Sequence, residues 1–167
     1  KASQPAPRDL PRALPFGSFL PSHLALHSAH RLGKGSQENQ TKIAETGAIG
    51  SLVGIMGAML PELQANSAEC MGVLAHEHPT NQATIARTGA IGPLCNLLRE
   101  GSEDKVKTRA AGALWALTIG NKPNKDTVTK LGGVDPLVGL IVTGESDESL
   151  AQAMGTLACL MHKHAEN

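Results

Sequence analysis

One fourteen-residue segment occurs three times in this chain. It reads NQATIARTGAIGPL at residues 81–94, with a close copy, NQTKIAETGAIGSL, at residues 39–52. A more divergent copy, NKDTVTKLGGVDPL, follows at residues 124–137. The copies therefore begin 42 and then 43 residues apart. Self-similarity at such a period is the signature of a solenoid, in which each unit buries its apolar face against the next.

Each unit predicts the same three helices. We expect Asn39, Asn81 and Asn124 to cap the first helices through their side-chain oxygens. A glycine eight residues further on ends each of these helices, because a left-handed turn suits glycine. The second and third helices carry apolar residues at helical spacing. No segment alternates with period two, so the sequence predicts an all-α solenoid. The expected core positions are Ile49, Leu52, Val53, Met56, Ala68, Met71, Leu74, Ile91, Leu94, Cys95, Leu98, Ala110, Leu114, Leu117, Val134, Leu137, Val138, Ile141, Ala153, Leu157 and Leu160.

Residues 1–22 differ from the rest of the chain because they hold half of its ten prolines. Proline interrupts helices, so we expect an extended arm that is disordered unless something holds it down. Its composition also overlaps that of organelle transit peptides, which stays open as an alternative. The apolar residues with which the arm would make contacts are Leu10, Leu14, Phe16, Phe19 and Leu20.

The repeats divide the remaining chain. Residues 23–38 predict a short helix that resembles the last helix of a preceding repeat, and three full units follow. They span residues 39–80, 81–123 and 124–167. The last of these residues, Asn167, falls where the first asparagine of a further unit would stand. We therefore expect either a segment of a longer solenoid or ends that are covered by other chains.

Composition excludes several classes of function. Fifteen basic and fifteen acidic residues cancel, and there are only three aromatic residues, so we expect no nucleic-acid binding. The longest apolar run, residues 47–60, is too short to cross a bilayer. The three cysteines lie in apolar stretches and predict reduced core thiols. We expect a cytoplasmic protein, with an organelle interior after removal of a transit peptide as the alternative.

No motif for catalysis, a metal or a cofactor stands out. His76 and His78 have counterparts at His162 and His164, but two repeats separate the pairs by about 20 Å, too far for shared metal ligands. Residues 33–36 contain a Gly-Lys-Gly-Ser sequence without the spacing of a phosphate-binding loop. We therefore expect a protein that is not an enzyme, with no catalytic residue, metal or cofactor.

Residues 39–167 resemble the armadillo repeat. The resemblance rests on three helices in about 42 residues, the Gly-Ala-Ile turn between the first two, and the sequence AAGALWAL of a third helix at residues 110–117. It implies a right-handed superhelix whose third helices line a concave groove. Members of the family bind extended peptides or protein partners in that groove and are not catalysts.

The same resemblance predicts which residues face the groove. Armadillo proteins that carry nuclear cargo have a tryptophan and, one turn later, an asparagine on each third helix. None of the three units here has this tryptophan–asparagine pair, which disfavours binding of nuclear-localisation signals. The corresponding positions are Gly72 and His76, Trp115 and Ile119, and Ala158 and His162. We expect Trp115 to be partly exposed as an anchor for a partner. His76 and His162 are either groove contacts or simply histidines that suit helix C-termini.

Two functions remain in view. The first is a non-catalytic scaffold or adaptor that binds an extended protein partner along the groove. The second is a structural accessory subunit of a large, organellar or other, multi-protein complex, docked through its proline-rich arm and its uncapped ends. Glycines also lie inside the predicted helices, where each costs about 1 kcal/mol relative to alanine. We expect some of them to permit close helix packing and the rest to leave a marginal stack that partners stabilise; they are Gly54, Gly57, Gly72, Gly112, Gly139 and Gly155.

Overall fold

The computed structural model describes residues 36–101 and 103–162. The predicted arm, residues 1–22 with its five apolar contacts, lies outside the described residues. So does most of the predicted remnant helix; its last residues, 36–38, belong to the first described helix and its cap.

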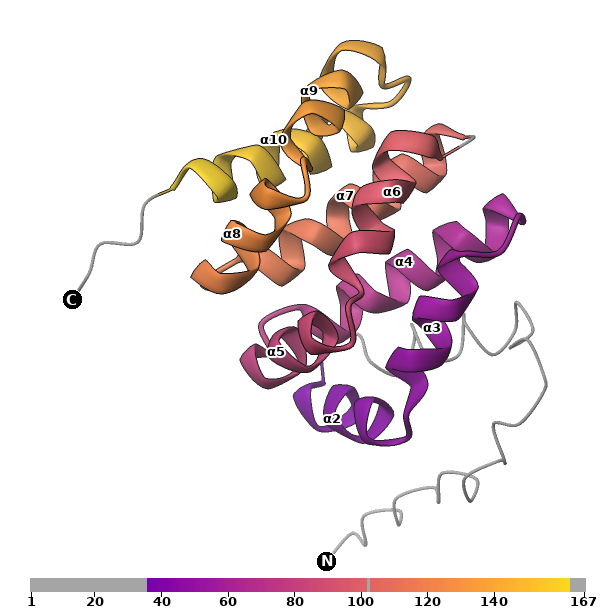
Figure 1. The fold of residues 1–167 in the computed structure, drawn as a ribbon, viewed down its shortest axis with the longest axis vertical. Coiled ribbons are helices and arrows are strands. Elements are labelled where there is room, and N and C mark those ends of the chain that lie inside the picture. The colour runs from indigo at the N-terminus through magenta and orange to yellow at the C-terminus, as the bar shows by residue number, and fades with distance from the viewer. Residues whose placement is uncertain (1–35, 102, 163–167) are drawn as a thin grey trace, which may run out of the picture.

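The described residues form nine helices and no strand. They run in chain order as three sets of three, and Figure 1 shows the sets stacked one on another from α2 to α10. The all-α solenoid is confirmed. The helices are α2 (Gln37–Glu45), α3 (Ala48–Met56), α4 (Pro61–Ala75), α5 (Pro79–Arg87), α6 (Ile91–Glu100), α7 (Asp104–Thr118), α8 (Lys122–Lys130), α9 (Val134–Thr143) and α10 (Asp147–Met161).

The first helix of each set begins earlier than expected, so the prediction that the three asparagines are caps is wrong. Ser36, His78 and Asn121 are the N-caps, and their side chains accept hydrogen bonds from the backbone N–H groups of Asn39, Asn81 and Asn124. The asparagines lie one turn inside the helices. Asn81 and Asn124 are buried and donate instead to the carbonyls of Leu74 and Leu117, near the ends of the preceding third helices.

The glycine turns are confirmed. Gly47, Gly89 and Gly132 follow the first helices with φ of 81°, 78° and 70°. This is the left-handed region, in which a Cβ is strained. Each turn sends the chain directly into the second helix and sets the angle between the first two helices of the set.

The core lies between the sets. Helix α7 packs between α4 and α10, and these two pairs make the most extensive helix contacts. Close approach depends on small residues: a Cβ at Gly72 of α4 would lie 3.3 Å from the Cα of Ala113 of α7. Most predicted core positions of the first two units, including Met71, Leu94 and Leu114, are buried.

The third unit is less buried than the sequence predicted. Val138 is 48% exposed, whereas its counterpart one unit earlier, Cys95, is 1% exposed. Ile141, Leu157 and Leu160 are only partly buried. Ile141, Leu157 and Leu160 still pack against the core, but no further described helix covers the outer side of α9 and α10.

The cysteines are thiols, and two of the three occupy the core. Cys70 and Cys95 are buried, but Cys159 is only partly buried, which corrects the prediction for that residue. Burial raises the pKa of Cys95 to about 11, because a thiolate loses its hydration in the core. No helix among the described residues has the length and apolar character needed to cross a membrane.

Candidate functional site: a groove across the third helices

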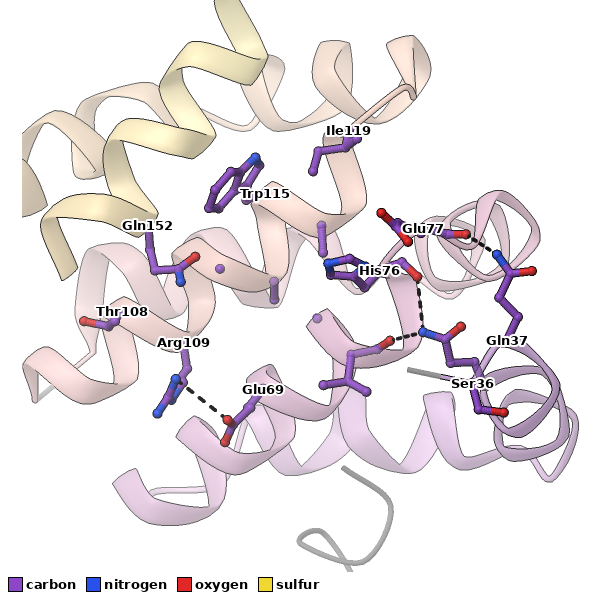
Figure 2. A pocket seen from close by; sticks show the side chains of 16 residues that line it. Ser36, Gln37, Glu69, His76, Glu77, Thr108, Arg109, Trp115, Ile119 and Gln152 are labelled. Carbon is purple, nitrogen blue, oxygen red and sulfur yellow. Dashed lines mark hydrogen bonds and ion pairs between the residues drawn. The ribbon is translucent and has the colours of Figure 1, made fainter. Parts of the chain in front are cut away.

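A groove of about 520 Å³ runs across the third helices. Residues of α4 and α7 make most of it, with one residue of α10 and the start of α2 at its edges (Figure 2). Its lining is Ser36, Gln37, Gln40, Glu69, Gly72, Val73, His76, Glu77, Thr108, Arg109, Gly112, Ala113, Trp115, Ala116, Ile119 and Gln152.

Small residues form the middle of the groove. Gly72 of α4 lies against Ala113 of α7, and the amide oxygen of Gln152 occupies space next to Gly112, 2.9 Å from where a Cβ would lie. Because these positions carry little or no side chain, the groove comes close to the helix backbones. Val73, Trp115 and Ile119 add apolar surface around this centre.

Trp115 is the only tryptophan of the chain, and its partial burial confirms the exposure predicted for it. Its ring lies against Gly155 of α10: a Cβ at that glycine would be 3.0 Å from three indole carbons. The indole N–H makes no hydrogen bond with any described residue. The ring is therefore held by α10 while one of its edges contributes to the groove.

Charged residues join the three third helices along one side. The guanidinium of Arg109 on α7 is 2.6 Å from a carboxylate oxygen of Glu148 on α10 and 3.7 Å from one of Glu69 on α4. One cation thus serves two carboxylates in neighbouring units. Lys105 makes a similar contact with Glu62, at 2.8 Å.

The C-terminal ends of the third helices are fixed from the first helices. The side-chain amide of Gln40 donates to the carbonyls of Val73 and His76, at 2.6 and 3.1 Å. Gln82 donates in the same way to Ala116 and Ile119, at 2.8 and 3.2 Å. A helix leaves its last carbonyls without partners, and these amides supply them.

In the third unit a lysine replaces the glutamine. Lys125 is 7% exposed, and its ammonium group donates to the carbonyl of His162 at 3.1 Å. A cation at this place also meets the negative end of the α10 dipole. The third helices of all three units are therefore held at the same end by an equivalent residue.

The structure brings four of the six predicted groove residues together. Gly72, His76, Trp115 and Ile119 line the groove, whereas Ala158 and His162 do not. Both lie on the last described third helix, where no further third helix supplies a second wall, and both are exposed. His76, Ile119 and His162 occupy equivalent C-cap positions.

Sequence reasoning missed the polar part of the lining: Glu69, Glu77, Arg109, Gln152 and the start of α2. A signal was present for two of them, because Asn66, Arg109 and Gln152 occupy the same position in successive units. Polar residues at one register position of stacked helices indicate a shared surface. The described residues contain no group of three or more His, Cys, Asp or Glu side chains that could hold a metal.

The fold and the groove define a helical-repeat solenoid, and comparison with known proteins places it more closely. The family model of the Armadillo/beta-catenin-like repeat matches residues 78–119, the second of the three units. Solved structures with the same fold include a designed armadillo repeat protein in complex with the peptide (KR)4, at 24% identity and a TM-score of 0.75. The alignment covers 81% of this chain and 56% of that one.

A computationally designed armadillo repeat protein for modular peptide recognition is 25% identical, with a TM-score of 0.74, and the match covers 82% of this chain and 57% of that one. An engineered protein is 22% identical, with a TM-score of 0.79 and coverage of 83% and 57%. The chain thus spans little more than half the length of these structures. No curated protein matches it significantly in sequence. Residues 78–119 therefore match the armadillo repeat, and the described residues as a whole have the armadillo-repeat fold.

Proposed function

We propose that this protein is a non-catalytic interaction scaffold that takes an extended segment of a partner protein along the groove. The observation that carries the proposal is a groove with a centre of small residues and hydrogen-bonding side chains that are not already in use. Among the described residues, no hydrogen bond engages the side chains of His76 and Gln152 or the indole N–H of Trp115.

An extended peptide suits such a groove. Its backbone presents N–H and C=O groups on alternating sides every 3.3 Å or so, and each needs a partner when it leaves water. Gln152 can donate and accept, and Trp115 can donate. The designed armadillo protein solved with a bound (KR)4 peptide supports the idea that this fold can hold an extended chain.

The experiment is a selection of extended ten-residue peptides on the immobilised full chain, followed by titrations. Because Trp115 is the only tryptophan and tyrosine is absent, intrinsic fluorescence reports directly on the groove. Trp115→Ala and Ile119→Ser should weaken binding by roughly tenfold or more, as expected of an anchor residue. Binding of the tryptophan-free variant is followed with a labelled peptide.

Met154→Ser is the matched control, because Met154 is exposed on α10 but outside the groove. It should leave peptide affinity unchanged. Circular dichroism of each variant separates lost binding from lost folding. Binding that survives both groove substitutions, or that Met154→Ser weakens equally, would contradict the proposal.

A specific observation also favours the second candidate, a structural subunit of a larger assembly. The outer side of α9 and α10 exposes residues that are buried at the equivalent positions of the second unit. Met154 is 54% and Met161 75% exposed, whereas their counterparts Ala111 and Thr118 are both fully buried. We propose that this face packs against a helical layer of another protein.

This second proposal is tested with a dye that fluoresces on apolar surfaces. The full chain alone should bind the dye, and Val138→Ser with Met154→Ser should abolish most of that signal, since both residues are exposed on this face. A chain that binds no dye would show that the face is already covered and would refute the proposal. The three thiols support a reducing location, such as the cytoplasm, for either function.

A further inference from the structure

Glu77 has a backbone conformation that its residue type disfavours. It lies between α4 and α5 and is the only described non-glycine residue with positive φ, at 52°. One unit later the equivalent position is Gly120, with φ of 66°. The connection between units requires a left-handed residue here, and the second unit meets that requirement with the residue that adopts it without strain.

Neighbouring side chains hold this connection in place. Gln37 of α2 donates a hydrogen bond of 2.9 Å to the carbonyl of Glu77, and Gln40 donates to the carbonyl of His76. In Figure 2 the carboxylate of Glu77 extends away from the carbonyl that Gln37 binds. The side chain lines the groove and is exposed.

The charges of the groove are not balanced. Arg109 is the only lysine or arginine among the residues that line the groove, and its guanidinium already lies 2.6 Å from a carboxylate oxygen of Glu148, which is outside the lining. Glu77 makes no ion pair with any described residue. Glu77 therefore brings to the groove a negative charge that no described residue neutralises, and this carboxylate is the one on the strained connection.

Backbone strain that persists at a surface position, where no packing requires the side chain, points to a role for that side chain. We propose that Glu77 determines the specificity of the groove by binding one cationic side chain, lysine or arginine, of the partner segment. This inference rests on the proposed peptide-binding function. It adds the charge of the ligand and the residue that selects it.

The test uses the full chain and a library of extended ten-residue peptides in which acidic, basic and neutral residues are equally frequent. Relative to the library, the peptides that wild-type protein selects should be enriched in lysine and arginine and depleted of aspartate and glutamate. Glu77→Gln should lower the affinity for those peptides roughly tenfold, the effect expected from loss of a hydrogen bond to a charged group. Replacing the basic residue of the peptide by norleucine should remove the difference between the two proteins. Glu77→Lys should reverse the preference towards acidic peptides.

Glu77→Gly distinguishes a binding role from a structural one. Glycine relieves the strain, so the melting temperature should stay equal or rise while affinity for basic peptides falls. Glu145→Gln is the control, because Glu145 is exposed and does not line the groove. It should change neither property.

The outcomes separate this inference from the function on which it rests. If peptides bind in the groove without a preference for basic residues, or if Glu77→Gln binds them as tightly as wild type, this inference is overturned and the proposed function stands. A Glu77→Gly variant that melts earlier also overturns it, because the glutamate would then be needed for folding. If no peptide of any charge binds the wild-type chain, the proposed function itself fails.

Discussion

The indole of Trp115 lies against the backbone of Gly155, the residue that faces it from the next third helix. A Cβ at position 155 would lie only 3.0 Å from three carbons of the ring. The glycine therefore positions the tryptophan at the edge of the groove, although it does not line the groove itself.

Gly155→Ala should move the ring and destabilise the fold. The added methyl group would lie 3.0 Å from three ring carbons, so either the ring or α10 must shift, at a cost of about 1–3 kcal/mol. Chemical denaturation measures the loss, and the emission maximum of the sole tryptophan should shift. Gly139→Ala is the control: a Cβ there meets nothing within 4 Å, and the helix should gain about 0.5–1 kcal/mol. Equal effects of the two substitutions would show that close packing does not explain the glycine.

Gln82→Met should destabilise the second unit by about 1–3 kcal/mol, because the carbonyls of Ala116 and Ile119 lose their buried partner. Methionine preserves the length and shape of the side chain, so the loss reports mainly on hydrogen bonding. Amide hydrogen exchange should accelerate at the end of α7. Asp126→Asn, an exposed change on a neighbouring first helix, should have almost no effect. An unchanged exchange rate at that helix end would argue against this role of Gln82.

His78 should be replaceable by asparagine but not by alanine. Its Nδ1 accepts from the backbone N–H of Asn81 at 3.2 Å, which places the ring proton on Nε2, where it meets the hydroxyl of Thr41 at 2.8 Å. His78→Asn restores the cap that Asn121 provides one unit later and should be nearly neutral. His78→Ala should cost about 1 kcal/mol in thermal or urea unfolding. Two substitutions with the same cost would mean that capping is not the function of the ring.

Cys95 should make stability fall as the pH rises from about 9 to 11. Burial raises the pKa of the folded thiol from 9.0 to about 11, so in this window the unfolded chain releases the proton while the folded chain retains it. The contribution of the residue is complete below pH 9 and is lost above 11. Urea unfolding across this range should show a steeper decline for wild type than for Cys95→Ala. Parallel curves for the two proteins would contradict the assignment.

The sequence predicts the fold well because the repeat is a property of the whole chain. A period of 42 or 43 residues and the left-handed glycines at 47, 89 and 132 are enough to define the helix order. The same periodicity placed Trp115 at the groove. The starts of the first helices were less predictable. Ser36 and Asn121 suit an N-cap no better than the asparagines three residues after them, and the histidine that caps the second unit, His78, is an unusual cap.

Much of the groove could not be predicted, because its polar residues come from contacts between units. Glu69, Arg109 and Glu148 lie on three different helices and form one ion-pair chain only when those helices stack. The conformation of Glu77 is equally invisible in the sequence, since nothing in its local pattern requires positive φ. Ala158 and His162 were predicted to line the groove because of their position in the repeat. That position does not reveal that no further third helix lies beside the last described one to form the second side of a groove.

The interlocking amides have a consequence for how this chain unfolds. The end of α4 receives hydrogen bonds both from Gln40 of its own unit and from Asn81 of the next, and the end of α7 receives them from Gln82 and Asn124. No third helix in these two units is complete until the following unit has begun to fold. Melting one unit alone would leave buried carbonyls of its neighbour without partners. The first two units should therefore unfold in a single cooperative transition rather than peel apart one after the other.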